Sequence, residues 1–362
     1  MRVLLLSAYD AQSHQHWRRS LCQGLPDWQW EVLTLPPRHF SWRVRGNALQ
    51  WALESRSILE QPYDLLLATS MVDLATLRGL VPALGHVPSV LYFHENQFAY
   101  PQERQQRGLL EAQIASIYSA LAADALLFNS CYNRDSFLAG VAELLGRLPD
   151  GVPGGVVQLL SGRAEVLPVP VEICGDSQQQ MRQDKLQLVW NHRWEYDKGP
   201  ALLLDIVEQL LASQVDFTLH VVGQQFRQAP ESFQALRQCL EAGGALGEWG
   251  YISDRQDYAR LLASCDVVLS TAQHDFQGLS VLEACSLACT PLVPDRLVYP
   301  EWFPPQFRYS EAAGAVAAIA GLAETRARGG ALPGYDSSAF SPALLIPRYE
   351  AFLRSQAQPN SV

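Results

Sequence analysis

Two acidic residues bracket a short turn in the segment HDFQGLSVLEA, residues 274–284. The apolar run before it predicts a strand and the spacing after it predicts a helix, so Asp275 precedes the helix that contains Glu283. Amides at a helix start attract anions and polar sugars, and Gly278 would let a ligand approach the backbone. The two carboxylates could therefore hold two parts of one ligand. The alternative is an acidic N-cap at Asp275 and an unrelated surface Glu283.

A second polar loop, WNHRWEYDKGP, places Arg193 and Lys198 after another apolar run and before a predicted helix start at Gly199 and Pro200. A guanidinium and an ammonium at a strand end suit a diphosphate, which needs paired cationic donors. Lys198 is one of only two lysines in the chain, so the lysine here favours a functional role. The alternative is an exposed loop closed by salt bridges.

Four polar side chains follow the apolar run of SVLYFHENQFAYP, namely His94, Glu95, Asn96 and Gln97. Polar groups after a buried strand are costly unless they bind something. At the carboxyl end of a parallel strand they would face a ligand site. The alternative is that the fold itself satisfies the histidine.

The segment RHFSWRVRGN interleaves basic and aromatic residues: Arg38, His39, Trp42, Arg43 and Arg45. Such a mixture suits an unstacked RNA base, which an aromatic ring stacks and arginines clamp by charge. It is equally typical of an amphipathic strand or loop at the rim of any binding site.

Composition places the chain among soluble globular proteins. Of its 362 residues 48% are hydrophobic and 18% are charged, and the opening apolar run is too short for a signal peptide or a membrane span. We therefore expect a cytoplasmic protein without a membrane partner. The net charge of −10 disfavours generic nucleic-acid binding, but residues 1–150 carry only −2 of it, so an anionic macromolecule should prefer that half. The seven cysteines show no metal-binding spacing.

Short apolar runs without alternation recur along the chain, each followed by a turn and a helical stretch. Six precede residue 170 and four follow residue 185. Strands buried on both faces have this pattern, which predicts an α/β fold with two doubly wound parallel sheets, each a Rossmann-like domain. Ligands are expected at the carboxyl ends of the strands. No GxGxxG motif follows the first run, which disfavours a dehydrogenase.

Domain boundaries follow from the pause in this series. We expect a first domain over residues 1–170, a Pro- and Gln-rich linker over 171–185, a second domain over 186–335, and a C-terminal segment with a helix over 336–362 that packs back on the first domain. We expect Pro347 to interrupt that final helix.

The Arg-x4-Lys loop followed by an acid-x7-Glu turn resembles the donor half of retaining GT-B glycosyltransferases. More narrowly, the chain is similar to the tRNA-queuosine α-mannosyltransferase family over almost its whole length. The similarity lies in the segments TLPPRHFSWRVRGNAL, LYFHENQFAYP, FNSCYNRDSFL, HRWEYDKGP, TAQHDFQGLSVLEA and LVYPEWFP. Members of that family move mannose from GDP-mannose to queuosine at the tRNA wobble position.

The resemblance implies donor-site roles in the second domain, with the two domains facing a cleft. Arg193 and Lys198 would hold the diphosphate, Glu283 the ribose, and Asp275 the transferred sugar. The donor-binding set is completed by Ile252, which offers backbone groups near the base, and by the turn residues Phe276, Gln277, Gly278 and Leu279. The first acid is usually Glu in this family, so Asp275 is one methylene shorter. No metal and no cofactor is expected.

In the first domain, the resemblance implies that His94 lies against the transferred sugar and departing phosphate, with Glu95 as the second choice for a base. Ser13 and His14 follow the first strand, where relatives carry glycines, but Asp10 and Ala11 occupy those places here. Ser13 could donate a hydrogen bond from a helix start or serve only as a cap. The expected acceptor-binding set is Ser13, His14, Arg38, Trp42, Arg43, Arg45, Glu95, Asn96 and Gln97.

The implied mechanism retains anomeric configuration by a front-face route in which the departing phosphate helps to deprotonate the acceptor hydroxyl. Closure of the domains over the donor would exclude water. Two alternatives remain open from sequence: the same enzyme class with a lipid, glycan or metabolite acceptor, and a non-catalytic nucleotide-sugar-binding module.

Overall fold

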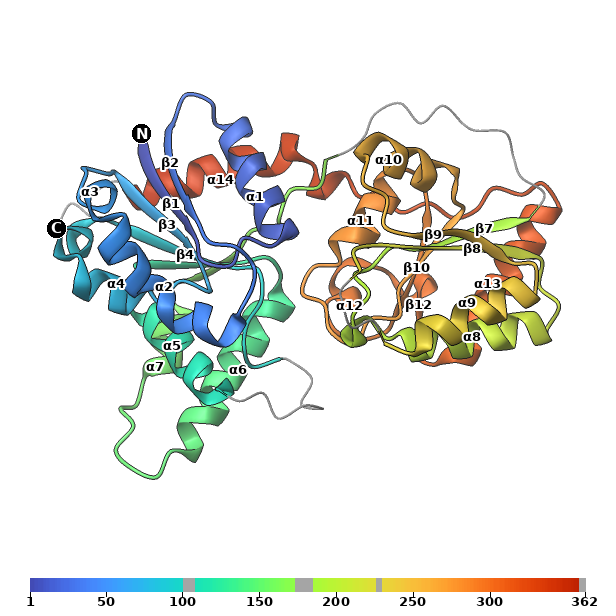
Figure 1. Cartoon of the computed structure of the whole chain (residues 1–362), viewed down its shortest axis with the longest axis horizontal. Helices are drawn as coiled ribbons and strands as arrows, with labels where there is room; N and C mark the ends of the chain where they lie inside the picture. The colour runs from blue at the N-terminus through green and yellow to red at the C-terminus, as the bar shows by residue number, and fades with distance from the viewer. Residues whose placement is uncertain (100–107, 173–184, 226–229, 358–362) are drawn as a thin grey trace. The chain divides into compact units, whose positions relative to one another are not determined.

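The computed structural model describes residues 1–99, 108–172, 185–225 and 230–357 (Figure 1). These form two compact units, each built around its own six-stranded sheet. The first unit comprises Met1–Pro170 and the chain from Pro342 onward, and the second comprises Val171–Ser341. Most of the linker expected at 171–185 lies outside the described residues.

The sheet of the first unit has the strand order β2-β1-β3-β4-β5-β6, and all its pairings are parallel. All residues of the central strands β3, β4 and β5 are buried, which is why their sequences are continuous apolar runs. The strands are β1 (Arg2–Ser7), β2 (Gln29–Thr34), β3 (Leu65–Thr69), β4 (Ser89–Phe93), β5 (Ala125–Phe128) and β6 (Ala164–Val166).

The helices of this unit connect successive strands, except the last, which the chain adds after completing the second unit. They are α1 (Gln12–Gly24), α2 (Phe40–Glu54), α3 (Arg56–Leu59), α4 (Leu74–Leu80), η1 (Pro82–His86), α5 (Leu109–Ala122), α6 (Cys131–Arg147), α7 (Val156–Ser161) and α14 (Pro342–Ala357). Helix α14 lies beside α1 (Figure 1).

The sheet of the second unit is also parallel, in the order β12-β11-β10-β7-β8-β9. Its strands are β7 (Leu186–Trp190), β8 (Phe217–Val222), β9 (Leu246–Gly250), β10 (Val267–Leu269), β11 (Thr290–Pro294) and β12 (Arg308–Tyr309). Its helices are η2 (Tyr196–Lys198), α8 (Pro200–Ala212), α9 (Ser232–Ala242), α10 (Arg255–Ser264), α11 (Leu279–Ser286), α12 (Tyr299–Trp302), η3 (Pro305–Phe307), α13 (Ala312–Ala327) and η4 (Ser338–Phe340).

All ten predicted runs are strands, and the predicted α/β class with two doubly wound sheets is confirmed. Strands β9 and β12 were not among the predicted runs. Strand β9 is mostly half-exposed and mixes Gly, Glu and Trp, and β12 has only two residues, so neither shows a continuous apolar run.

The strand order reverses once in each sheet, between β1 and β3 and between β7 and β10. At such a reversal the loops leaving two neighbouring strands diverge to opposite faces, which leaves room for a ligand at their carboxyl ends. The topology therefore places one candidate site in each unit, in the loops after β1 and β3 and after β7 and β10.

Helix α14 is held to the first unit by a buried tyrosine. The Tyr349 hydroxyl accepts a hydrogen bond from Trp17 Nε1 at 3.2 Å and lies 3.0 and 3.1 Å from the carbonyl oxygens of Leu167 and Pro168. Contrary to our expectation, Pro347 does not interrupt the helix. A proline inside a helix removes one backbone hydrogen bond, and four buried side chains hold this helix in place despite that loss: Leu345, Ile346, Tyr349 and Leu353.

Replacing Tyr349 with Phe should lower the free energy of unfolding by about 1–3 kcal/mol, because the Trp17 N–H and a carbonyl oxygen would be left buried without a partner. Urea denaturation of the full chain measures this change. Tyr118→Phe is the matched control, since Tyr118 is exposed on α5 and should lose little. Equal stability of the two variants would contradict this role of Tyr349.

Candidate functional site

The polar loops of the second unit meet at the reversal between β7 and β10. Residues 191–199 follow β7 and residues 270–278 follow β10, and these two strands are paired in parallel. Gly199 brings the loops into backbone contact: its φ is +66°, and a Cβ at this position would lie 2.1 Å from the Thr271 carbonyl oxygen. The Thr271 hydroxyl also donates to the Lys198 carbonyl at 2.7 Å.

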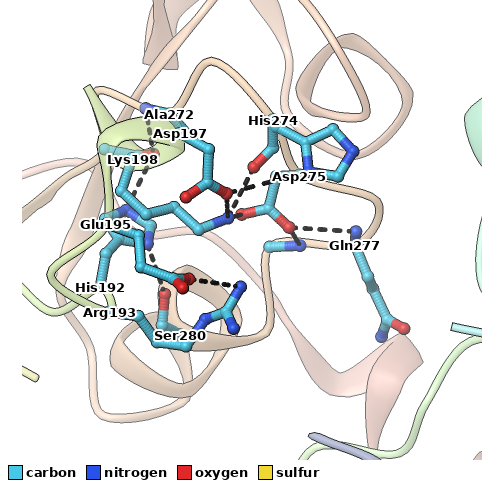
Figure 2. A network of polar contacts seen from close by, with 12 residues as sticks. His192, Arg193, Glu195, Asp197, Lys198, Ala272, His274, Asp275, Gln277 and Ser280 are labelled. Carbon is cyan, nitrogen blue, oxygen red and sulfur yellow. Dashed lines mark hydrogen bonds and ion pairs between the residues drawn. The ribbon is translucent and has the colours of Figure 1, made fainter. Parts of the chain in front are cut away.

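Lys198 is buried where the two loops meet (Figure 2). Its ammonium donates to the His274 carbonyl oxygen at 2.6 Å and lies 3.4 Å from an oxygen of Asp197 and 3.7 Å from one of Asp275. A buried cation needs such partners because its desolvation is costly. The structure therefore brings the predicted pair Lys198 and Asp275 together, and adds Asp197 as a second carboxylate beside the ammonium.

Asp275 organises the turn before α11. Its Oδ1 accepts from the amides of Gly278 at 2.9 Å and Gln277 at 3.4 Å, and its Oδ2 accepts from the Tyr299 hydroxyl at 3.2 Å. The N-cap position of α11 is Gly278, with φ +73°, so the alternative of an N-cap at Asp275 is wrong. The carboxylate instead stabilises the turn three residues earlier.

Both carboxyls near Lys198 are held ionised. Burial alone would raise the pKa of Asp275, but Lys198, His192 and the two turn amides bring it below its ordinary value. For Asp197, burial also opposes ionisation, and Lys198, the His274 side chain and Arg193 together lower the pKa well below its usual range. Nothing in the spacing of the sequence singled out Asp197.

His192 is a further residue that the sequence analysis missed. Its ring is buried, with Nε2 3.0 Å from the Ser270 hydroxyl and Nδ1 3.2 Å from the Ser280 hydroxyl. Ser270 in turn contacts the Tyr299 hydroxyl at 2.7 Å, so a chain of polar contacts leads from His192 to Asp275. Burial and then the charge of Lys198 lower the pKa of His192 to about 4, so its ring is neutral at pH 7.

Arg193 lies in the same loop, half-exposed, with its guanidinium 3.0 Å from a Glu195 oxygen (Figure 2). This geometry corresponds to the salt-bridged loop considered as an alternative. The charge of Arg193 nevertheless reaches the buried cluster, because it lowers the pKa of both His192 and Asp197. A guanidinium at the surface beside a buried ammonium is a chemically suitable pair for a diphosphate.

The other predicted donor residues surround this cluster at varied depth. Glu283 lies on α11 with a carboxylate oxygen 3.8 Å from Arg255, and Phe276 packs edge-on against His274. Gln277 is buried, whereas Leu279 is half-buried at the start of α11. Ile252 is half-buried after β9, two strands away from β7, so the topology does not place it next to Lys198.

In the first unit, His14 and His94 form a stacked pair. Their ring centroids are 4.0 Å apart at 19°, and Glu95 Oε2 lies 3.9 Å from His14 Nε2. The rings of Trp17 and Tyr92 pack edge-on against His94. Burial, followed by the neighbouring histidines, lowers the pKa of His94 well below its ordinary value. The structure therefore brings three predicted residues together after β1 and β4, with the His94 imidazole neutral.

The loop after β4 owes its shape to Asn96. Its amide nitrogen lies 2.9–3.0 Å from three acceptors on Asn133 and Ser136, and its oxygen accepts from the amides of Phe98 and Ala99. These contacts use the hydrogen-bonding capacity of its side chain, so Asn96 holds the loop in place. Gln97 is buried beside it, and its Oε1 has no hydrogen-bond partner among the described residues.

The turn after β1 shows how the chain tolerates Asp10 in place of a glycine. The buried Asp10 carboxylate pairs with Arg18 at 2.9 Å. The N-cap of α1 is Ala11, so the alternative of a capping role for Ser13 is wrong. Ser13 is half-buried in the first turn of α1, next to His14.

From Phe40 onward the basic-aromatic segment is part of helix α2, so the alternative of an amphipathic strand or loop is wrong there. Residues of α2 are buried at positions 44, 48, 51 and 52, which is the period of a helix packing one face on the unit. Arg43 is also buried, donating to Gln50 at 3.0 Å, whereas Arg38, Trp42 and Arg45 are exposed. The structure therefore divides the predicted acceptor residues of this segment between core and surface.

The described residues were expected to contain neither a metal site nor a membrane-spanning helix. Among them, no group of three His, Cys, Asp or Glu side chains is suited to a metal ion. None of their helices has both the length and the apolar composition to cross a bilayer. Metal independence itself remains a prediction.

Both halves of the chain match known protein families. Residues 2–171 match the family model "tRNA-queuosine alpha-mannosyltransferase N-terminal", and residues 176–320 match "Glycosyl transferases group 1". A tRNA-queuosine alpha-mannosyltransferase of Drosophila melanogaster is 34% identical over 319 residues, which cover 85% of this chain and 83% of that protein.

Solved structures with the same architecture include Anabaena HepE in complex with UDP, with a TM-score of 0.66 at 16% identity over 98% of this chain and 100% of that one. Another is a trehalose-phosphate synthase of Burkholderia xenovorans, with a TM-score of 0.66 at 12% identity over 99% of each chain. At these identities the likeness shows the fold alone. It confirms the predicted GT-B fold class.

The contact at Gly199 should make Gly199→Ala more damaging than Gly244→Ala. Both glycines have a φ near +65°, but a Cβ at 244 meets nothing within 4 Å, whereas one at 199 overlaps the Thr271 backbone. We expect about 1 kcal/mol of destabilisation at 244 from the backbone conformation and clearly more at 199. Thermal unfolding of both variants measures the difference, and equal losses would show that the two loops do not depend on this contact.

The neutral His192 should make stability fall as the solution is acidified. The unfolded chain binds a proton at this residue near pH 6.5 and the folded chain only near pH 4, so the unfolded state gains about 3 kcal/mol between these values. His192→Asn should therefore flatten the fall of unfolding free energy between pH 6.5 and 4. Urea denaturation at several pH values checks this, and an unchanged slope would contradict it.

Proposed function

The chain belongs to the tRNA-queuosine α-mannosyltransferase family, and from this membership we propose that it transfers mannose from GDP-mannose to queuosine at the wobble position of tRNA, with retention and without a metal. That the chain is a glycosyltransferase follows from the match to the group 1 family model together with the mannosyltransferase relative. The observation that carries the proposed acceptor is the 34% identity that extends over 319 residues and so over both units.

The donor is proposed to bind where the loops after β7 and β10 meet. Lys198 and Arg193 would compensate the diphosphate charge, and the amides at the start of α11 would add donors to it. When the sugar–phosphate bond breaks, its electron pair passes to the phosphate oxygen, so these groups stabilise the leaving group as its charge grows. Because Asp197 and Asp275 hold the ammonium in place, Lys198 needs little reorganisation during the reaction.

The acceptor hydroxyl is proposed to bind at the His14, His94 and Glu95 cluster of the first unit. His94 is neutral at pH 7, so it can accept or donate one hydrogen bond without adding charge. Its Nε2 has no hydrogen-bond partner in the described part of the chain, which supports its availability to a substrate. The acceptor proton would pass to the departing phosphate.

Lys198→Ala should lower kcat/KM for mannose transfer by about 100-fold or more, because the leaving group loses its buried cation. The chain supplies a matched control in its other lysine: Lys185→Ala removes an exposed ammonium that pairs with Asp216 and should leave transfer unchanged. Transfer is measured by incubating queuosine-containing tRNA with GDP-mannose and quantifying hexosylated queuosine by nucleoside mass spectrometry.

Three results would contradict the proposal. If the wild-type enzyme forms no hexosylated queuosine on any queuosine-containing tRNA, queuosine is not the acceptor. The remaining hypotheses are then another acceptor or a non-catalytic binding role. If another sugar nucleotide raises the melting temperature more than GDP-mannose and is turned over faster, GDP-mannose is not the donor. Full activity of Lys198→Ala would remove the proposed diphosphate site.

A further inference from the structure

A large aromatic side chain lies exposed at the start of α2. Trp42 is 58% exposed, whereas tryptophan side chains are on average highly buried. Its ring lies directly over Gly46, one turn later: a Cβ at position 46 would be 2.4 Å from Trp42 Cε2 and 2.6 Å from Cζ2. Only glycine leaves room for the ring there. The indole is therefore seated on the helix backbone while much of its surface faces solvent.

The surroundings of this ring are basic in an acidic protein. The sequence contains no Asp or Glu between Glu31 and Glu54, although the whole chain carries a net charge of −10. Arg38 is exposed and forms no ion pair with any residue in the described ranges, and the Arg45 side chain is 55% exposed. The start of α2 and the residues just before it thus combine an exposed ring with cationic groups, which is complementary to a polyanion that carries aromatic bases.

Helix α2 is tied to the edge of the sheet that carries the proposed acceptor cluster. Arg45 lies 3.7 Å from Asp73, in the loop after β3, and the Asp73 amide donates to Asn47 at 3.1 Å. Val44 and Gln97 line the same small cavity, of about 10 Å³, next to Asp73. The start of α2 and the loop that follows β4 are therefore neighbours at the carboxyl edge of this sheet.

We propose that Trp42, seated on Gly46 and flanked by Arg38 and Arg45, is a stacking platform for an unpaired base of the acceptor RNA beside the nucleotide that receives the sugar. This inference rests on the proposed function, which supplies a tRNA loop as acceptor. Bases in single-stranded loops are commonly bound by stacking on aromatic rings, and arginines beside them contact phosphates without reading sequence. Gly46 serves as a positioning residue, because it sets where the ring lies.

The same face of α2 continues as Leu49 and Leu53, both exposed. These two apolar side chains alone would fit a protein partner as well. The basic residues, however, lie at the Trp42 end, and this end is tied to the loops at the sheet edge. The observations therefore favour RNA, and self-association through α2 becomes an outcome of the test.

The platform is tested by binding, without donor, of a queuosine-containing tRNA anticodon stem-loop to the full chain. Trp42→Ala should raise Kd about 10-fold, since stacking of one base commonly contributes that much, and Trp42→Phe should raise it less. Gly46→Ala should also weaken binding, because the added methyl group displaces the Trp42 ring. The melting temperature of this variant should stay equal to that of the wild type or rise, because alanine has a higher helix propensity than glycine. Leu53→Ala is the matched control and should bind as the wild type does.

Stem-loops with an abasic site on either side of the queuosine identify the stacked base. If Trp42 stacks on one of the two neighbouring bases, removing that base should weaken binding to the wild type. Removing the same base should cause no further loss of affinity in Trp42→Ala. Wild-type Kd values for both Trp42→Ala and Gly46→Ala would overturn the platform. The platform would also be overturned if sedimentation velocity showed that Trp42→Ala loses self-association while its RNA binding is unchanged.

Failure of the platform and failure of the proposed function give different results. If the wild type transfers mannose to tRNA and Trp42→Ala does so with the same KM, the platform is wrong and the reaction stands. If the wild type binds the stem-loop through Trp42 but transfers no sugar, the reaction is wrong and the platform stands.

Discussion

The site of the second unit depends on the burial of one ammonium group where two loops meet. Lys198 closes the contact between the loops after β7 and β10 because it donates to one backbone carbonyl and pairs with a carboxylate from each loop. A lysine can remain charged at such depth only with these partners. The ammonium also keeps both aspartates ionised. Gly199 lets the two backbones touch, and burial, followed by the charge of Lys198, keeps His192 neutral.

The first unit obeys the same topological rule with different chemistry. Its reversal of strand order places the turn after β1 beside the loop after β3, and β4 adds the next loop at the same edge. At this edge the neutral His94 imidazole stacks on the His14 ring, and the Glu95 carboxylate lies beside His14. A buried ammonium in one unit and a neutral imidazole in the other suit the proposed reaction, in which a sugar leaves a diphosphate and is transferred to a hydroxyl acceptor.

Two residues that were expected to depart from the family pattern, Asp275 and Asp10, both make contacts that stabilise their loops. Asp275 is one methylene shorter than the usual Glu, yet it binds the turn amides and the Tyr299 hydroxyl, so its carboxylate has a structural role that suits the shorter side chain. Asp10 stands where the resemblance led us to expect a glycine, and its pairing with Arg18 offsets the burial of its charge. Both side chains therefore make structural contacts in the loops that follow β1 and β10.

The sequence alone determined the α/β class, the ten strands that contain apolar runs and the loops that carry chemistry, because buried parallel strands and helix starts leave local patterns in residue type. It also singled out Lys198, Asp275, His14 and His94, since polar residues after apolar runs are visible along the chain. It did not show that Asp197 and His192 are parts of the site. Nor did it show that α2 is a helix or that the Trp42 ring packs on Gly46. These features depend on contacts between residues far apart in the chain or on which face of an element is buried. Strand order and packing decide such contacts, and they are tertiary properties that local periodicity does not encode.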